Sequence, residues 1–277
     1  MNPKILAISC LFSAASLHAA TTYEWTFNGG NLNSALGNGT MAAADASTST
    51  QIGYASTNGT TVPHIGGQTA QYLTVPALTA TTSGLLATFS SSGPNGGGNY
   101  INDYTVIMDI YSPGAAGWQA LFNTDVANSN DADFYINGSG QVGIGALGYG
   151  TTPTVAQNQW NRVAFVADLD AGIVKYFVNG TLAFTRTGAA LTDGRFAVYS
   201  SANAGADLLF FNEGDTSGTY THALYVNSIA FTDSTLSDAA IASLGGAKAA
   251  GIFVPEPGSS LLIALSGVGL VARRRRA

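Results

Sequence analysis

The sequence predicts an all-β protein built as a sandwich of two antiparallel sheets. Only 9% of its 277 residues are charged, and 34 are glycine, whereas about 25% charge is usual in a soluble domain. Short runs of β-branched and aromatic residues recur along the chain, separated by turns rich in Gly, Asn and Thr. Strands at such close spacing, with few helical patterns between them, favour a sandwich.

The clearest strands lie in the second half of the chain. Alternation in residues 104–112 predicts a strand with Tyr104, Val106, Met108 and Ile110 on one face. The same pattern in residues 160–168 predicts that Val163, Phe165 and Ala167 point inward. Residues 21–71 fit short strands around Tyr23, Trp25 and Phe27. Further strands are expected at 118–122, 133–136, 141–144, 195–200, 207–211 and 225–231.

A hairpin and one helix complete the predicted elements. Two apolar runs, 173–178 and 181–185, flank Asn179 and Gly180, and this dipeptide supplies the positive φ angles of a type I′ turn. A short helix should follow Ser237, a favourable N-cap residue, and end at Gly245. We expect its apolar residues, Ile241 and Leu244, to pack on the sandwich.

The first 20 residues predict a secretory signal peptide. Lys4 precedes an apolar stretch from Ile5 to Leu17, and small residues follow before Thr21. The alternatives are a buried first element and a lipidated Cys10. Cys10 is the only cysteine, so the body after it has neither a disulfide nor a thiol nucleophile.

The last 26 residues, 252–277, predict a signal that holds the chain at the membrane. Residues 258–272 are apolar, but as a helix they would span only about 22 Å, against about 30 Å for a bilayer core. A cluster of four arginines then favours retention on the cytoplasmic side. The alternative is a plain C-terminal tail anchor. The retention residues are Arg273, Arg274, Arg275 and Arg276.

The order of these parts resembles the PEP-CTERM sorting signal of bacteria. Pro255, Glu256 and Pro257 precede the apolar segment and the arginine cluster. The resemblance implies that a membrane enzyme, an exosortase, recognises these three residues. It also implies processing of the signal and release toward the cell surface or extracellular matrix. Before processing, the chain would be held in the inner membrane by its C-terminal helix.

The body, residues 21–251, resembles the laminin-G-like, concanavalin-A-like jelly roll. The residues that carry the resemblance are Trp160 at the start of a strand, the Asn179–Gly180 hairpin, and a late strand at 225–230 followed by the short helix. These features are architectural, so they imply a fold rather than an activity.

The charge of the body excludes nucleic acid as a partner. Leaving out Lys4, Glu256 and the four terminal arginines leaves 5 basic and 15 acidic residues, a net charge of −10. Phosphate backbones are bound by clustered Lys and Arg, which this body lacks. Some glucanases of this fold use a Glu-x-Asp-x-x-Glu strand, which is absent here. Glu213 and Asp215 form the nearest carboxylate pair and would carry the alternative, a divergent glycan hydrolase or lyase.

Calcium is the expected cofactor, if the body holds one. Residues 123–133 place Asp125, Asp131 and Asp133 between two strands, and calcium takes six to eight oxygen ligands. The alternative is a plain polar loop. Tyr100, Tyr149 and Tyr220 lie near glycine-rich turns and are candidate stacking platforms for sugars. The sequence therefore favours a non-catalytic surface or matrix protein that binds extracellular polysaccharide or protein. A purely structural matrix component is the other non-enzymatic alternative.

Overall fold

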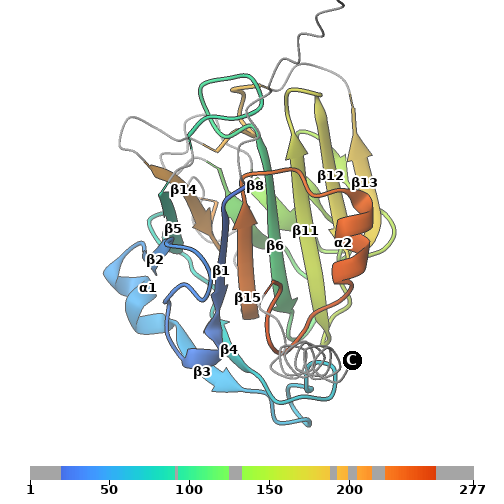
Figure 1. Ribbon diagram of the computed structural model, residues 1–277. Helices are drawn as coiled ribbons and strands as arrows, with labels where there is room; N and C mark the ends of the chain where they lie inside the picture. Colours follow the sequence, from blue (N-terminus) through green and yellow to red (C-terminus); the bar gives the residue numbers. More distant parts are fainter. Residues whose placement is uncertain are drawn as a thin grey trace, which may run out of the picture.

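The computed structural model describes residues 20–90, 93–124, 133–187, 192–198, 205–213 and 222–253. Two antiparallel sheets face each other (Figure 1). Sheet A has the strand order β13-β12-β11-β6-β15-β4-β3, and β1 also pairs with β15. Its strands are β1 (Thr22–Thr26), β3 (Gly53–Ser56), β4 (Gln71–Val75), β6 (Asp103–Tyr111), β11 (Trp160–Asp168), β12 (Ile173–Val178), β13 (Thr181–Arg186) and β15 (Leu224–Thr232).

Sheet B has the strand order β10-β9-β8-β7-β14-β5-β2. Every strand pair in both sheets is antiparallel, so the predicted fold class is confirmed. The strands of sheet B are β2 (Thr40–Ala43), β5 (Leu85–Ser90), β7 (Gln119–Asn123), β8 (Asp133–Ile136), β9 (Val142–Ile144), β10 (Gly148–Tyr149) and β14 (Gly205–Phe210).

The main core lies between the sheets. The inward faces of β6 and β11 were predicted from their alternation, and all seven of those side chains are buried there. Phe165 in sheet A meets Phe122 and Phe134 in sheet B edge-on, with ring centroids 5.4 Å apart in both pairs. Edge-to-face contact suits the quadrupoles of the rings, so this aromatic contact joins the two sheets.

The predicted hairpin and helix are both present. Asn179 and Gly180 have φ values of 50° and 79°, as a type I′ turn requires. Helix α2 (Asp238–Leu244) begins after Ser237, whose hydroxyl accepts a hydrogen bond from the Ala240 amide, and it ends at Gly245. Ile241 is buried in a second apolar cluster on the outer face of sheet A. Figure 1 shows α2 and the segment after it covering that face.

Three short features depart from the prediction. The strand expected at 195–200 is, within the described residues, a single bridge between Val198 and Ile101. Two backbone carbonyls that could continue the ladder instead accept hydrogen bonds from side-chain hydroxyls. The Arg195 carbonyl accepts one from Thr124, and the Phe196 carbonyl accepts one from Tyr104. An unforeseen helix, α1 (Ala46–Gln51), starts where the Asp45 carboxylate accepts a hydrogen bond from the Thr48 amide. A short 3₁₀ turn, η1 (Phe27–Gly29), follows β1.

The two terminal signals fall outside the described residues, apart from residue 20 and residues 252–253. This applies to the proline–glutamate–proline motif, the apolar segment and the arginine cluster. Among the helices that the structure describes, none is long and apolar enough to cross a bilayer.

Candidate functional site

Three aromatic rings gather on the outer face of sheet B. Trp118, just before β7, lies edge-on to Tyr135 of β8 and Tyr149 of β10, with centroid distances of 6.1 and 5.7 Å and interplanar angles of 79° and 86°. Trp118 is 37% exposed, and few other large hydrophobic residues are exposed in the part of the chain that the structure describes. We call these three residues the aromatic platform.

Strand register explains why these rings meet. Tyr149 pairs with Gly143, Gly143 with Tyr135, and Tyr135 with Ala120, which makes one row across four strands. Side chains in such a row share a face, and the core residues Phe134 and Val142 beside them point the other way. In this row the small residues Ala120 and Gly143 alternate with the two tyrosines. A Cβ at Gly143 would collide with Tyr149, so a larger residue there would displace that tyrosine. The row therefore leaves space for aromatic rings to lie over the backbone.

Polar groups border the aromatic platform. The buried carboxylate of Glu213 accepts a 2.8 Å hydrogen bond from the Tyr135 hydroxyl, and the Asn123 amide holds the Glu213 carbonyl at 2.6 Å. Burial first, and then the negative charge of Asp133, raise the pKa of Tyr135 well above its usual value. The phenol stays protonated and donates to the carboxylate. His222 is exposed and lies against Gly117, one residue before Trp118.

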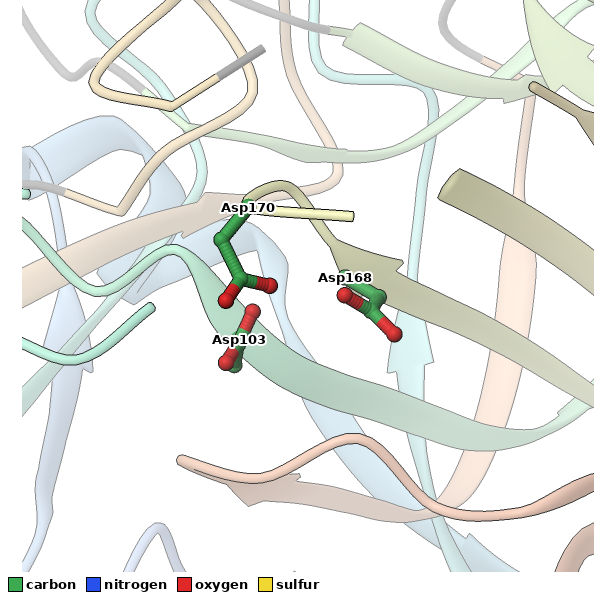
Figure 2. A group of neighbouring side chains, drawn as sticks. All are labelled: Asp103, Asp168 and Asp170. Atoms are coloured by element: carbon green, nitrogen blue, oxygen red, sulfur yellow. The ribbon is translucent and has the colours of Figure 1, made fainter. Parts of the chain in front are cut away.

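A separate group of three aspartates lies where two central strands of sheet A, β6 and β11, meet at one end of the sheet. Asp103 begins β6 and pairs with Asp168, the last residue of β11, and Asp170 follows in the turn to β12. One carboxylate oxygen from each lies within 4.8 Å of the others. Figure 2 shows the carboxylates of Asp103 and Asp170 turned toward each other. These are oxygen ligands of the kind that calcium prefers, and calcium needs more than three of them.

The three carboxylates disturb one another's ionisation. Burial, followed by repulsion from Asp170 and Asp168, raises the pKa of Asp103 to about 6. Burial and a hydrogen bond with Asp170 raise the pKa of Asp168, and the Ala171 amide and then the charge of Lys175 partly offset this rise. A divalent cation would relieve this repulsion, and protonation relieves it as well. A groove of about 370 Å³ runs from Asp168 past Lys175 to Asp238.

The residues proposed from the sequence are only partly described. Asp133 begins β8 opposite Asn123, and it is half-buried. Its proposed calcium partners, Asp125 and Asp131, lie outside the described residues, so this site stays a prediction. The pairing of Glu213 with Asp215 also stays a prediction, because Asp215 lies outside the described residues. Of the three tyrosines proposed as sugar platforms, Tyr149 belongs to the aromatic platform, Tyr100 is half-buried elsewhere and Tyr220 is not described.

Sequence reasoning missed Trp118, His222 and the group formed by Asp103, Asp168 and Asp170. The aspartate group depends on pairing between strands that are far apart in the chain. One local signal existed, since Asp168 and Asp170 frame the end of a clear strand. Trp118 was assigned to a strand, although it precedes β7 and remains exposed.

Comparison with known proteins bears first on the C-terminus. Residues 253–276 match the PEP-CTERM protein-sorting motif. The resemblance drawn from the three ordered parts of the tail is thereby confirmed. This motif is the substrate signal for exosortase, and it implies export to the surface or extracellular space through a stage held at the membrane. A search among curated proteins finds no significant match for the chain.

Solved structures with a similar fold are β-sandwich jelly-roll domains. One is domain 4 of AbnA, an extracellular arabinanase of family GH43 from Geobacillus stearothermophilus, solved with arabinotriose. It has a TM-score of 0.50 and 17% identity over 82% of this chain and 98% of that one. The botulinum neurotoxin serotype D binding domain has a TM-score of 0.49 and 12% identity over 80% of this chain and 50% of that one. At 17% identity the likeness to the AbnA domain shows the fold alone.

Proposed function

We propose that this exported, exosortase-processed protein is a non-catalytic surface or matrix component whose sandwich binds neutral extracellular polysaccharide. The observation that carries the proposal is the exposed Trp118 ring, held edge-on by Tyr135 and Tyr149. A rigid aromatic surface with polar groups at its border suits a sugar ring, which has an apolar face and a hydroxylated rim. The exposed His222 supplies a polar group at that border.

Charge favours a neutral polymer over an acidic one. The body carries a net charge of −10 by sequence, so a polyanion would be repelled over the distance of a Debye length. Only neutral or basic polysaccharides are then expected to approach the aromatic platform without a salt-dependent penalty. The alternatives to polysaccharide binding are binding to a protein partner and a purely structural role.

Binding is tested by affinity electrophoresis in gels that contain arabinan, xylan, β-glucan or a uronic-acid polymer. We expect retardation by at least one neutral polymer, and we expect Trp118→Ala to weaken it about tenfold or more, as loss of a central aromatic anchor does. Tyr54→Ala is the matched control, because Tyr54 is 39% exposed on β3 of the other sheet. Equal retardation of all three proteins would place any binding elsewhere. No retardation by any polymer would favour the structural role.

An enzymatic function is tested on the same polymers. The alternative hydrolase or lyase would use Glu213 with Asp215, so Glu213→Gln should abolish release of sugar fragments. The hydrogen bond from Tyr135 and the burial of Glu213 are consistent with a structural carboxylate. Fragment release that disappears in Glu213→Gln, while the unfolding temperature is kept, would overturn the non-catalytic proposal.

A further inference from the structure

Residues 245–253 form a segment, here termed the C-terminal strap, that crosses the outer face of sheet A. It begins at the C-cap of α2 and ends two residues before Pro255. Ile252 is buried in the apolar cluster beneath α2. The strap is not a strand of either sheet, so its backbone groups need other partners.

A buried ion pair holds the middle of the C-terminal strap. Arg162 of β11 binds Asp109 of β6 through two bonds, of 2.6 and 2.7 Å, and both side chains are at most 2% exposed. Two further N–H groups of the guanidinium donate to the carbonyls of Leu244, at 2.9 Å, and Gly251, at 3.2 Å. The Asp109 carboxylate also accepts the Lys248 amide at 3.2 Å. Arg162 and Asp109 therefore bind the chain at Leu244, just before the strap, and at Lys248 and Gly251 within it.

The carboxylate of Glu24 holds the end of the C-terminal strap. Glu24 lies in the middle of β1 with no exposed surface, and it accepts the amides of Ile252, at 2.5 Å, and Phe253, at 2.8 Å. Gly251 has a φ of +121°, and a Cβ there would overlap the Glu24 carboxylate. Asn28 adds a 2.8 Å bond to the Ala249 carbonyl. Charge-assisted bonds of this kind are among the stronger ones in proteins.

The sorting motif starts where these bonds end. Adjacent Cα atoms lie about 3.8 Å apart, so the Cα of Pro255 stays within about 8 Å of that of Phe253. The connection between the sandwich and the motif is thus short. A released strap would instead let the sandwich move back by up to about 30 Å, at about 3.3 Å for each of its residues.

We propose that the C-terminal strap is a latch that limits access of the membrane processing enzyme to the sorting motif. An enzyme that reads an extended peptide uses main-chain hydrogen bonds. In the latched state, the amides of Ile252 and Phe253 and the carbonyl of Gly251 are occupied. The enzyme therefore reads from Val254 onward, with the folded body beside it. This inference rests on the proposed processing by exosortase and concerns its regulation.

Opening of the latch is measured first, on the full-length precursor purified in mild detergent. Lys248 is exposed within the strap, so trypsin cleaves after it when the strap opens. We expect Gly251→Ala and Glu24→Gln to raise the rate of this cleavage about tenfold, because cleavage follows the open population. Gly66→Ala is the matched control, since Gly66 also has positive φ, at 57°, but a Cβ added there would meet nothing within 4 Å. Unchanged cleavage in both strap variants would overturn the latch.

Processing is then followed by pulse-chase in a host that carries an exosortase. We expect Gly251→Ala to be processed several-fold faster than the unaltered chain and Gly66→Ala at an unchanged rate. Insertion of eight Gly and Ser residues between Phe253 and Val254 should speed processing equally while leaving cleavage after Lys248 unchanged. This variant keeps the latch closed and moves the motif away, so it stays informative if Gly251→Ala misfolds. The same insertion between Gly66 and Gly67 serves as its control.

The outcomes separate the latch from the sorting function itself. Slower or unchanged processing of the insertion variant would overturn the proposal that the latch limits access. Absence of processing in the unaltered chain, or processing that Glu256→Ala leaves unchanged, would instead overturn processing by exosortase. The tryptic result on the purified precursor would be unaffected by that second outcome.

Discussion

Arg162 and Asp109 form a two-bonded ion pair that is almost completely buried on the outer face of sheet A. The pair is buried because α2 and the C-terminal strap cover it, and three further hydrogen bonds join the pair to the backbone of α2 and the strap. Removing one partner of such a pair leaves a buried charge uncompensated. The pair therefore couples the C-terminal segment to the stability of the whole sandwich.

Arg162→Met should lower the free energy of unfolding by about 3 to 5 kcal/mol, because Asp109 is left buried without its cation. Urea denaturation at pH 7 measures this change. Lys175→Met is the control, since Lys175 and Asp238 form a partly exposed pair at the surface, where such pairs contribute about 0 to 1 kcal/mol. Similar losses in the two variants would contradict the structural role assigned to Arg162.

Asp103→Asn should stabilise the protein at neutral pH but not at low pH. The pKa of Asp103 is raised to about 6 in the folded state, from 3.8. The folded state thus binds a proton more tightly than the unfolded state, and the stability that this proton contributes is present below about pH 4 and lost as the pH rises through 6.

The asparagine variant avoids that loss, so we expect it to be more stable by about 1 kcal/mol at pH 7.5, after allowance for solvent screening. The difference should disappear at pH 4. Urea denaturation at both pH values measures it, and Asp238→Asn is a control outside the aspartate group. A gain of equal size at both pH values would show that charge repulsion is not its cause.

Calcium should raise the unfolding temperature if either group of aspartates holds it, because a ligand of the folded state stabilises by about 2.7 kcal/mol at a hundredfold excess over its dissociation constant. Thermal unfolding with calcium or with a chelator is compared in the unaltered chain, Asp131→Ala and Asp170→Asn. Loss of the shift in Asp131→Ala would place the ion in the loop predicted from sequence. Loss in Asp170→Asn would place it at Asp103, Asp168 and Asp170. Absence of any shift at millimolar calcium would reject both sites.

Gly180→Ala should destabilise the protein by about 1 to 2 kcal/mol, since φ at this position is 79° and alanine is strained there. A Cβ would also approach the Cα of Gly245 at 3.1 Å, so α2 should be disturbed along with the hairpin. Denaturant midpoints measure the loss. Gly67→Ala, with φ 81° and nothing near its Cβ, should show the backbone effect alone. An equal loss in the two variants would exclude the contact with α2.

The sequence alone determined the features that depend on local pattern. Alternation assigned the buried faces of β6 and β11, the dipeptide Asn179–Gly180 assigned a hairpin, and Ser237 with Gly245 bounded α2. The sorting motif was also readable, because its three parts stand in a fixed order along the chain. Each of these signals lies within a short window, where backbone geometry and side-chain type are directly linked.

Only the tertiary structure decided which distant residues meet. Strand register placed Asp103 opposite Asp168 and put Tyr149 and Tyr135 in one row beside Trp118. The tertiary structure also brought Glu24, near the start of the chain, to where its carboxylate accepts hydrogen bonds from the amides of Ile252 and Phe253. No local pattern contains such pairings, because they follow from the order of strands in a sheet, and that order is set by packing of the whole core.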